Sequence, residues 1–144
     1  MLDPTVKELN IRRSVKKFFV DNITEYPLYF DRIITSDPGV KDSDGAWISI
    51  ALGGINNRHV SQCTLSLYTF TIKDPEGIKN AQVRDKIIEV MFPGFIDLYD
   101  TDSHPWKKIG AMKIQFLPQE DTSFARDQSR MSAVTCFLKW GTVW

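Results

Sequence analysis

Residues 58–72 read RHVSQCTLSLYTFTI, and this stretch decides the fold. Successive side chains of a strand point to opposite faces, so Cys63, Leu65 and Leu67 share one apolar face. Tyr68 and Phe70 lie on the other face among polar residues. The pattern predicts a long strand with one face in a core and large groups near the end of its second face.

The segments on either side of this strand complete the expected set of elements. Residues 46–52, AWISIAL, alternate cleanly, and the turn at 53–57 makes the long strand their hairpin partner. A cap residue and a proline, Asp3-Pro4 and later Asp74-Pro75, precede each of two helical periods. The expected elements are helices over 3–22 and 74–91, strands over 27–34, 46–52, 58–72, 95–99, 106–117 and 134–140, and polar loops over Thr35–Gly45 and Gln119–Arg130.

This order, α-β-β-β-α-β-β in its main elements, predicts an α+β fold. Clustered strands with only two helices favour a mostly antiparallel sheet with both helices packed on one face. In the second helix we expect an apolar side of Val83, Ile87, Val90 and Met91 with Ala81 and Ile88, and outward charges at Arg84, Asp85, Lys86 and Glu89. The chain of 144 residues fits a single domain, 1–144.

Composition and charge exclude several classes of protein. Hydrophobic residues make up 42% and charged residues 25% of the chain, which is typical of a globular protein and not of a disordered one. Lys and Arg number 18, as do Asp and Glu, so the formal net charge is zero. A dedicated nucleic-acid binder usually has a basic surface. Neutrality also leaves self-association unopposed.

The cysteines and the N-terminus indicate an intracellular protein. Cys63 and Cys136 both lie in strand-like runs, so we expect buried free thiols and a reducing compartment. Asp3, Lys7 and Glu8 interrupt the N-terminal segment, which therefore does not resemble a signal peptide. No apolar run approaches the ~20 residues of a transmembrane helix, and we expect no membrane partner.

The residues that could carry chemistry form no recognised motif. His59 lies at a strand start and His104 in a loop, without the spacing of a zinc site. Asp97, Asp100 and Asp102 precede His104, but the glycine that a calcium loop needs is absent. We therefore expect no catalytic residues, no metal and no cofactor, and a protein that is not an enzyme.

Two groups of side chains are candidates for contact surfaces. The first helix carries a basic cluster, Arg12, Arg13, Lys16 and Lys17, at i, i+4 spacing. This cluster is either a plain solvated face or a surface for an acidic partner, including DNA passing nearby. Trp47 and Phe137 lie opposite the apolar faces of their strands, and Trp144 ends the chain. Large groups on both sheet faces indicate that the second face is covered as well, either by loops or by another copy of the chain, and they make these residues candidates for a subunit or partner interface.

A succession of patterned stretches runs through most of the chain. It comprises the N-terminal helix, WISI at 47–50, QCTLSLYTF at 62–70, GIKNAQVRDKII at 77–88 and FLKW at 137–140. This succession resembles the tail terminator, or tail completion, proteins of long-tailed bacteriophages. The resemblance implies a structural virion protein that forms a homohexameric ring on the last ring of the tail tube and ends tube polymerisation.

The same resemblance implies partners and a location. The ring would contact the tail tube protein and join the tail to the head-completion, or connector, protein. DNA would pass through the hole without sequence-specific binding. The protein would lie in the virion tail at the head–tail interface after assembly in the host cytoplasm. The loops Thr35–Gly45 and Gln119–Arg130 are candidates for reaching neighbouring subunits or the tube.

Other functions remain open. Head-completion proteins and tail tube proteins share this size and patterning, although two capped helices favour the terminator. A small-molecule-binding α+β domain or enzyme is the alternative of another class. It would need a pocket with convergent polar groups, and Asp97, Asp102 and His104 would be its members.

Overall fold

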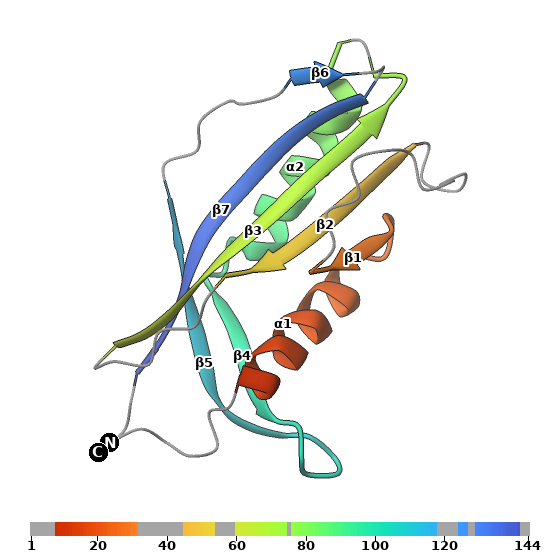
Figure 1. The fold of residues 1–144 in the computed structure, drawn as a ribbon. Helices are drawn as coiled ribbons and strands as arrows, with labels where there is room; N and C mark the ends of the chain where they lie inside the picture. The colour runs from red at the N-terminus through yellow and green to blue at the C-terminus, as the bar shows by residue number, and fades with distance from the viewer. Residues whose placement is uncertain are drawn as a thin grey trace.

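Figure 1 shows a computed structural model of the chain, which describes residues 8–31, 45–53, 60–74, 76–117, 124–126 and 129–141. The fold is α+β, as predicted, but four strands follow the second helix where two or three were expected. The elements are α1 (Glu8–Asn22), β1 (Leu28–Phe30), β2 (Ala46–Leu52), β3 (Val60–Ile72), α2 (Ile78–Met91), β4 (Phe95–Asp100), β5 (Lys107–Phe116), β6 (Phe124–Arg126) and β7 (Ser129–Gly141).

The strands form one mostly antiparallel sheet. Its order is β1-β2-β3-β7-β5-β4, and β6 pairs with one end of β7. β3 and β7 pair along their whole length, from Val60 opposite Gly141 to Ile72 opposite Ser129. β2 pairs with β3 as the predicted hairpin partner, whereas β1 runs parallel to β2. The long stretch that decides the fold is therefore the centre of the sheet.

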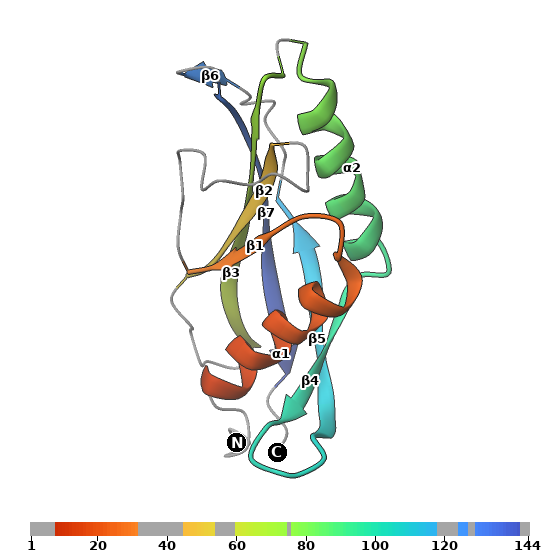
Figure 2. The same cartoon turned by 90° about the vertical axis from the view of Figure 1, so that its right-hand side faces the viewer.

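Helix α1 lies between the two edge strands of a curled sheet. Figure 2 shows it in front of the sheet, with β1 on one side and β4 on the other, while α2 covers a second region. The β4–β5 register shifts between Leu98 and Tyr99, and such a bulge bends and twists a strand pair. The curl brings both edges of the sheet to α1, which contacts the end of β1 on one side and β4 on the other.

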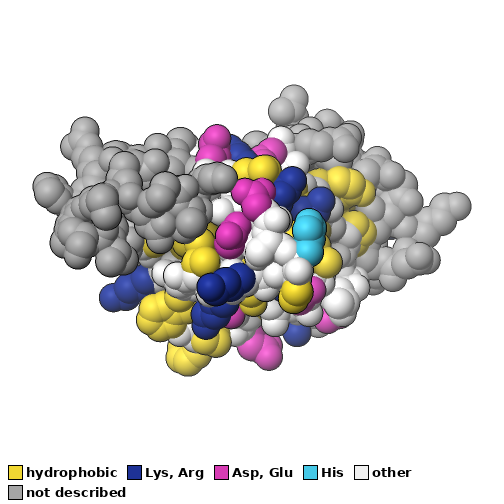
Figure 3. Space-filling model, turned by 90° about the horizontal axis from the view of Figure 1, so that it is seen from below, with side chains coloured by type: hydrophobic (Ala, Val, Ile, Leu, Met, Phe, Trp, Pro, Cys, Tyr) yellow, Lys and Arg dark blue, Asp and Glu magenta, His cyan; other side chains and the backbone are white. Residues whose placement is uncertain are grey.

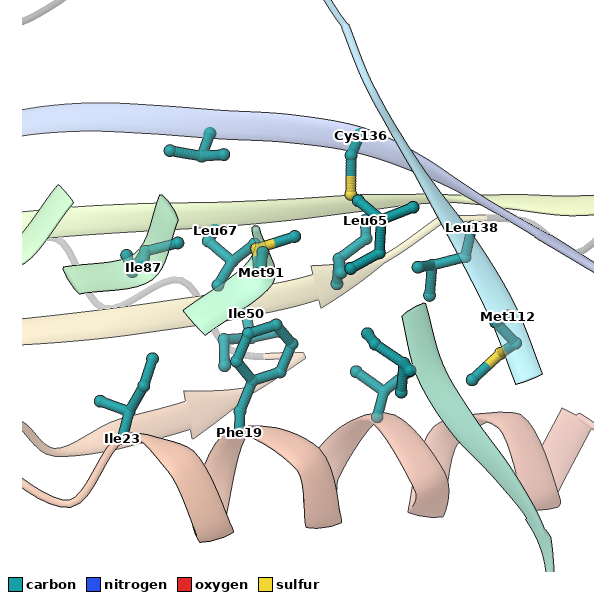
Figure 4. Close-up of a cluster of buried hydrophobic side chains, with 14 of the residues drawn as sticks. Phe19, Ile23, Ile50, Leu65, Leu67, Ile87, Met91, Met112, Cys136 and Leu138 are labelled. Carbon is teal, nitrogen blue, oxygen red and sulfur yellow. The ribbon is translucent and has the colours of Figure 1, made fainter. Parts of the chain in front are cut away.

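The core fills the space between the helices and the sheet. In α1, Ile11, Val15 and Phe19 recur every four residues and are buried, because this spacing puts them on one side of a helix. Figure 4 shows side chains from both helices and the sheet pointing toward one another. The labelled residues are Phe19, Ile23, Ile50, Leu65, Leu67, Ile87, Met91, Met112, Cys136 and Leu138.

Several boundaries differ from the expectation. The segment Gln119–Arg130 was expected to be a loop, but it contains β6, and β7 begins at Ser129. α1 ends at Asn22 as predicted, whereas Asp3 and Pro4 lie outside the described residues, as do residues 32–44 of the first expected strand and loop. No helix in the described part of the chain is long and apolar enough to cross a membrane.

Candidate functional site

Buried polar side chains of α1 hold the helix against the edge strand β4. The Asn10 carboxamide oxygen accepts hydrogen bonds from the Thr101 hydroxyl at 2.7 Å and the Thr101 N–H at 3.2 Å. One turn later, Ser14 Oγ accepts the Tyr99 N–H at 3.0 Å. β4 is an edge strand of the described sheet. These contacts supply some of the hydrogen bonds that a further neighbouring strand would make. The hydrogen bonds of Asn10 and Ser14 therefore fix the position of α1, which carries the predicted basic cluster.

Two members of the basic cluster lie toward β1. Arg12 donates to Asp31 at 2.7 Å and to Glu8 at 3.5 Å. The Lys16 ammonium lies 5.6 Å from the centre of the Phe30 ring. Exposed pairs of this kind contribute little to stability. Arg12 is thus neutralised within the chain, whereas the partner of exposed Lys16 among the described residues is an aromatic ring.

The other two members lie toward β4. Arg13 Nη1 donates to the Thr101 hydroxyl at 3.2 Å. Lys17 Nζ donates to Asp21 at 2.6 Å and lies 6.0 Å from the Tyr99 ring centre. The hydrogen bond and charge of Asp21 raise the pKa of Lys17. Lys17 therefore stays charged at neutral pH, and both side chains are accessible at the surface.

A groove opens between α1 and the β4–β5 loop. It has a volume of about 750 Å³. The Tyr99 and Trp106 rings, 6.2 Å apart, form part of its lining, and Val20 adds an aliphatic group. Figure 3, seen from below, shows basic side chains among hydrophobic ones at this end of the molecule. The groove thus combines apolar surface with three cations, Arg13, Lys16 and Lys17, and one carboxylate, Asp21.

Helix α2 presents a second surface, which the sequence did not reveal. Ala81 and Ile88 were expected on its apolar side, but both are exposed, Ile88 at 37%. Phe92, just after the helix, is 81% exposed. Asp85 and Glu89 lie outward as predicted. The exposed side of α2 is therefore a stripe of apolar and acidic residues, and its four-residue spacing was the signal available in the sequence.

The predicted aromatic interface residues have three different outcomes. Trp47 is completely buried and stacks on Phe70, with ring centres 5.5 Å apart and an angle of 12°. Its assignment to a subunit interface is corrected, since a fully buried ring offers no surface to a partner. Phe137 is half-buried on the sheet face opposite the helices, with Lys139 Nζ 5.8 Å from its ring centre. Trp144 lies outside the described residues.

The acidic loop is held by contacts within the chain. Asp97 pairs with Lys108 at 3.0 Å, and the Asp100 carboxylate accepts the Asp102 N–H at 3.1 Å. His104 is exposed. In the described part of the chain, no group of three or more His, Cys, Asp or Glu residues could hold a metal ion. His59 lies outside the described residues.

Both cysteines are buried and unpaired on neighbouring strands. Burial raises the pKa of Cys63 to about 11, against a smaller opposite effect of Arg12. Burial, and then the nearby Cys63, raise the pKa of Cys136 to about 12. A nucleophilic cysteine needs a lowered pKa, so these two thiols are core residues.

Comparisons with known proteins identify the fold alone. No family model matches the chain, and no curated protein matches it. A solved structure without a functional name aligns with a TM-score of 0.61 over 96% of this chain and 98% of that chain. The two sequences are 10% identical, so the likeness extends to architecture only.

Proposed function

We propose that this protein is a tail terminator of a long-tailed bacteriophage. It forms a homohexameric ring that caps the tail tube, ends tube polymerisation and presents a surface to the head-completion protein. It is a structural component rather than an enzyme, and it works without a cofactor. Its place is the head–tail interface of the virion, after assembly in the host cytoplasm.

The observation that carries the proposal is the exposure of large apolar side chains on two separate helix surfaces. Leu9 and Val20 on α1 are 47% and 46% exposed, and Phe92 beyond α2 is 81% exposed. Ile88, which is 37% exposed, lies one turn before Phe92. Exposed apolar groups that gather in this way are typical of interaction sites. A head-to-tail ring needs two different surfaces on each subunit, whereas a two-fold dimer needs one.

The fold supports the proposal through the elements that carry the family resemblance. Those stretches correspond to α1, β2, β3, α2 and β7, in the expected order. The zero net charge fits a ring through which DNA passes without being bound. A head-completion protein could use the same surfaces, and the experiment below separates the two roles.

The small-molecule alternative finds less support. Asp97 lines a hollow of about 130 Å³ beside Lys17 and Asp21. Asp102 and His104 are exposed in the neighbouring loop. Replacing Asp97, Asp102 and His104 with Ala should therefore leave ring assembly intact, whereas a ligand-binding domain would lose its ligand.

A tube-capping assay tests the function. The tail tube protein of the same phage is allowed to polymerise with and without the purified protein, and tube lengths are measured in negative-stain images. A terminator shortens the tubes and appears as a ring at one end. Undiminished tubes with bare ends would contradict the proposal, and binding to the head portal alone would identify a head-completion protein.

A further inference from the structure

The exposed stripes of the two helices match in spacing and oppose each other in charge. On α1, an apolar residue, two cations and an apolar residue occupy positions 9, 13, 17 and 20. On α2, an apolar residue, two anions and an apolar residue occupy positions 81, 85, 89 and 92. Both sets have steps of four, four and three residues. The two stripes are Leu9, Arg13, Lys17 and Val20 (the basic stripe) and Ala81, Asp85, Glu89 and Phe92 (the acidic stripe).

Each set forms a continuous stripe along its helix. With 3.6 residues per turn, these steps keep all four side chains within about a quarter of the helix circumference. Each stripe spans ~16 Å, at 1.5 Å per residue. The spacing therefore allows two cations of one helix to face two anions of another, with apolar groups at both ends.

The stripes do not meet within one chain. Leu9, Val20 and Phe92 are all substantially exposed, and Asp85 and Glu89 are exposed as well. Figures 1 and 2 show the two helices over different regions of the sheet. Their matching pattern is therefore available to a second copy.

We propose that the acidic stripe of one subunit packs against the basic stripe of the next. Phe92 at one end enters the groove beside Val20, where Tyr99 and Trp106 supply aromatic surface. The Lys17–Asp21 pair within the chain is exposed and weak, so Lys17 exchanges it for an intersubunit partner. The contact joins two different surfaces, so it is head-to-tail, the type of contact that the proposed ring requires.

This inference rests on the proposed ring and specifies which surfaces build it. Charge complementarity selects the partner, because the wrong pairing places like charges together. Two basic stripes repel each other, and so do two acidic stripes. Opposite charges face each other along the whole contact only when the basic stripe of one subunit packs against the acidic stripe of the next.

Charge reversal tests the pairing. The variants Arg13→Glu/Lys17→Glu and Asp85→Lys/Glu89→Lys each present two stripes of like charge. We expect each variant alone to be a monomer, with at least a ~100-fold higher concentration needed for assembly. Lys73→Glu, at an exposed position in the turn after β3 and outside both stripes and the groove, is the control and should assemble normally.

Mixing the two variants is the decisive step, because their stripes are complementary to each other. A one-to-one mixture should restore rings in which the variants alternate, and native mass spectrometry should find them in equal numbers. Circular dichroism of each variant verifies folding. The single chain that carries all four reversals should assemble by itself.

The outcomes separate this inference from the function on which it rests. If the wild-type protein forms rings and both charge-reversal variants form them as well, the stripe pairing is overturned and the ring function stands. Folded variants that stay monomeric when mixed would also overturn the pairing, as would equal loss of assembly in the control. A wild-type protein that forms no ring alone or on tail tubes would overturn both proposals.

Discussion

Thr101 and Asn10, 91 residues apart in the chain, share two hydrogen bonds at the junction of α1 and β4. Asn10 is 1% and Thr101 3% exposed, so neither bond is replaced easily by water. The Thr101 hydroxyl also accepts from Arg13. One threonine thus anchors the helix and orients a cation of the basic stripe.

Replacing Thr101 with Val should lower the free energy of unfolding by about 1–3 kcal/mol, because the Asn10 oxygen loses one buried donor. Urea unfolding measures the change. Thr24→Val is the matched control, since Thr24 is exposed and its hydroxyl donates to the neighbouring Glu25 at 3.3 Å. Equal effects of the two substitutions would contradict the anchoring role of Thr101.

Asp74 stabilises the start of α2 in its charged form. Its carboxylate accepts the N–H groups of Asn80 and Lys79 and the Thr71 hydroxyl. Burial raises its pKa, but these hydrogen bonds outweigh burial and lower the pKa overall. The unfolded chain therefore binds a proton first as the pH falls, and the stabilisation present at neutral pH is lost in acid.

We expect Asp74→Asn to cost about 1 kcal/mol at pH 7, the usual size of a cap effect. The difference from the wild type should shrink as the pH falls below the ordinary aspartate pKa of 3.8. Urea unfolding at several pH values measures this, with Glu76→Gln as an exposed control. A difference that stays constant across this range would show that the charge plays no part.

The buried thiols predict a loss of stability in alkali. The folded pKa values are about 11 for Cys63 and about 12 for Cys136, against an ordinary 9.0. As the pH rises above 9.0, the unfolded chain releases these protons first, so stability falls toward the folded pKa values. Below pH 9.0 the contribution is intact.

Urea midpoints between pH 7 and pH 10.5 measure this slope. The variant Cys63→Ala/Cys136→Ala should be less stable at every pH, because it leaves cavities in the core. Its stability should nevertheless fall less steeply in alkali. Parallel slopes for the two proteins would rule out ionisation of the thiols as the cause.

Substitutions of a buried and an exposed aromatic residue, Trp47 and Phe92, should differ in their effect on stability. Trp47→Ala should cost about 3–5 kcal/mol, since the ring is fully buried against Phe70. Phe92→Ala should change the stability of the monomer by about 0.5 kcal/mol or less, because the ring is exposed. Thermal unfolding of dilute protein checks both, and a costly Phe92 substitution would place that ring in the core of the subunit.

The strands with alternating apolar residues were predictable from the sequence. The bounds 46–52 were correct because β2 combines β-branched residues with a period of two. β6 and the start of β7 were missed because Arg126, Ser129 and Arg130 read as a polar loop. Backbone pairing determines the structure there, because β6 pairs with β7 and the start of β7 pairs with β3, and composition does not record such pairing.

The surfaces were harder to predict than the fold. Ile88 was assigned to the apolar side of α2 because the sequence does not give the width of the buried stripe. Asn80 occupies a core position instead, where it donates to the carbonyls of Thr69 and Arg130 and accepts from Ser132. A buried polar group of this kind depends on partners far along the chain. The basic cluster was identified, but its acidic counterpart requires the orientation of α2.

The mass of the wild-type protein in solution tests the central claim most directly. Light scattering over a range of micromolar concentrations, with negative-stain images of the same sample, distinguishes a closed ring from other states. We expect particles of about six times the mass of one chain, seen as rings with a central hole. A monomer at every concentration, which also leaves the ends of tail tubes bare, would contradict the claim.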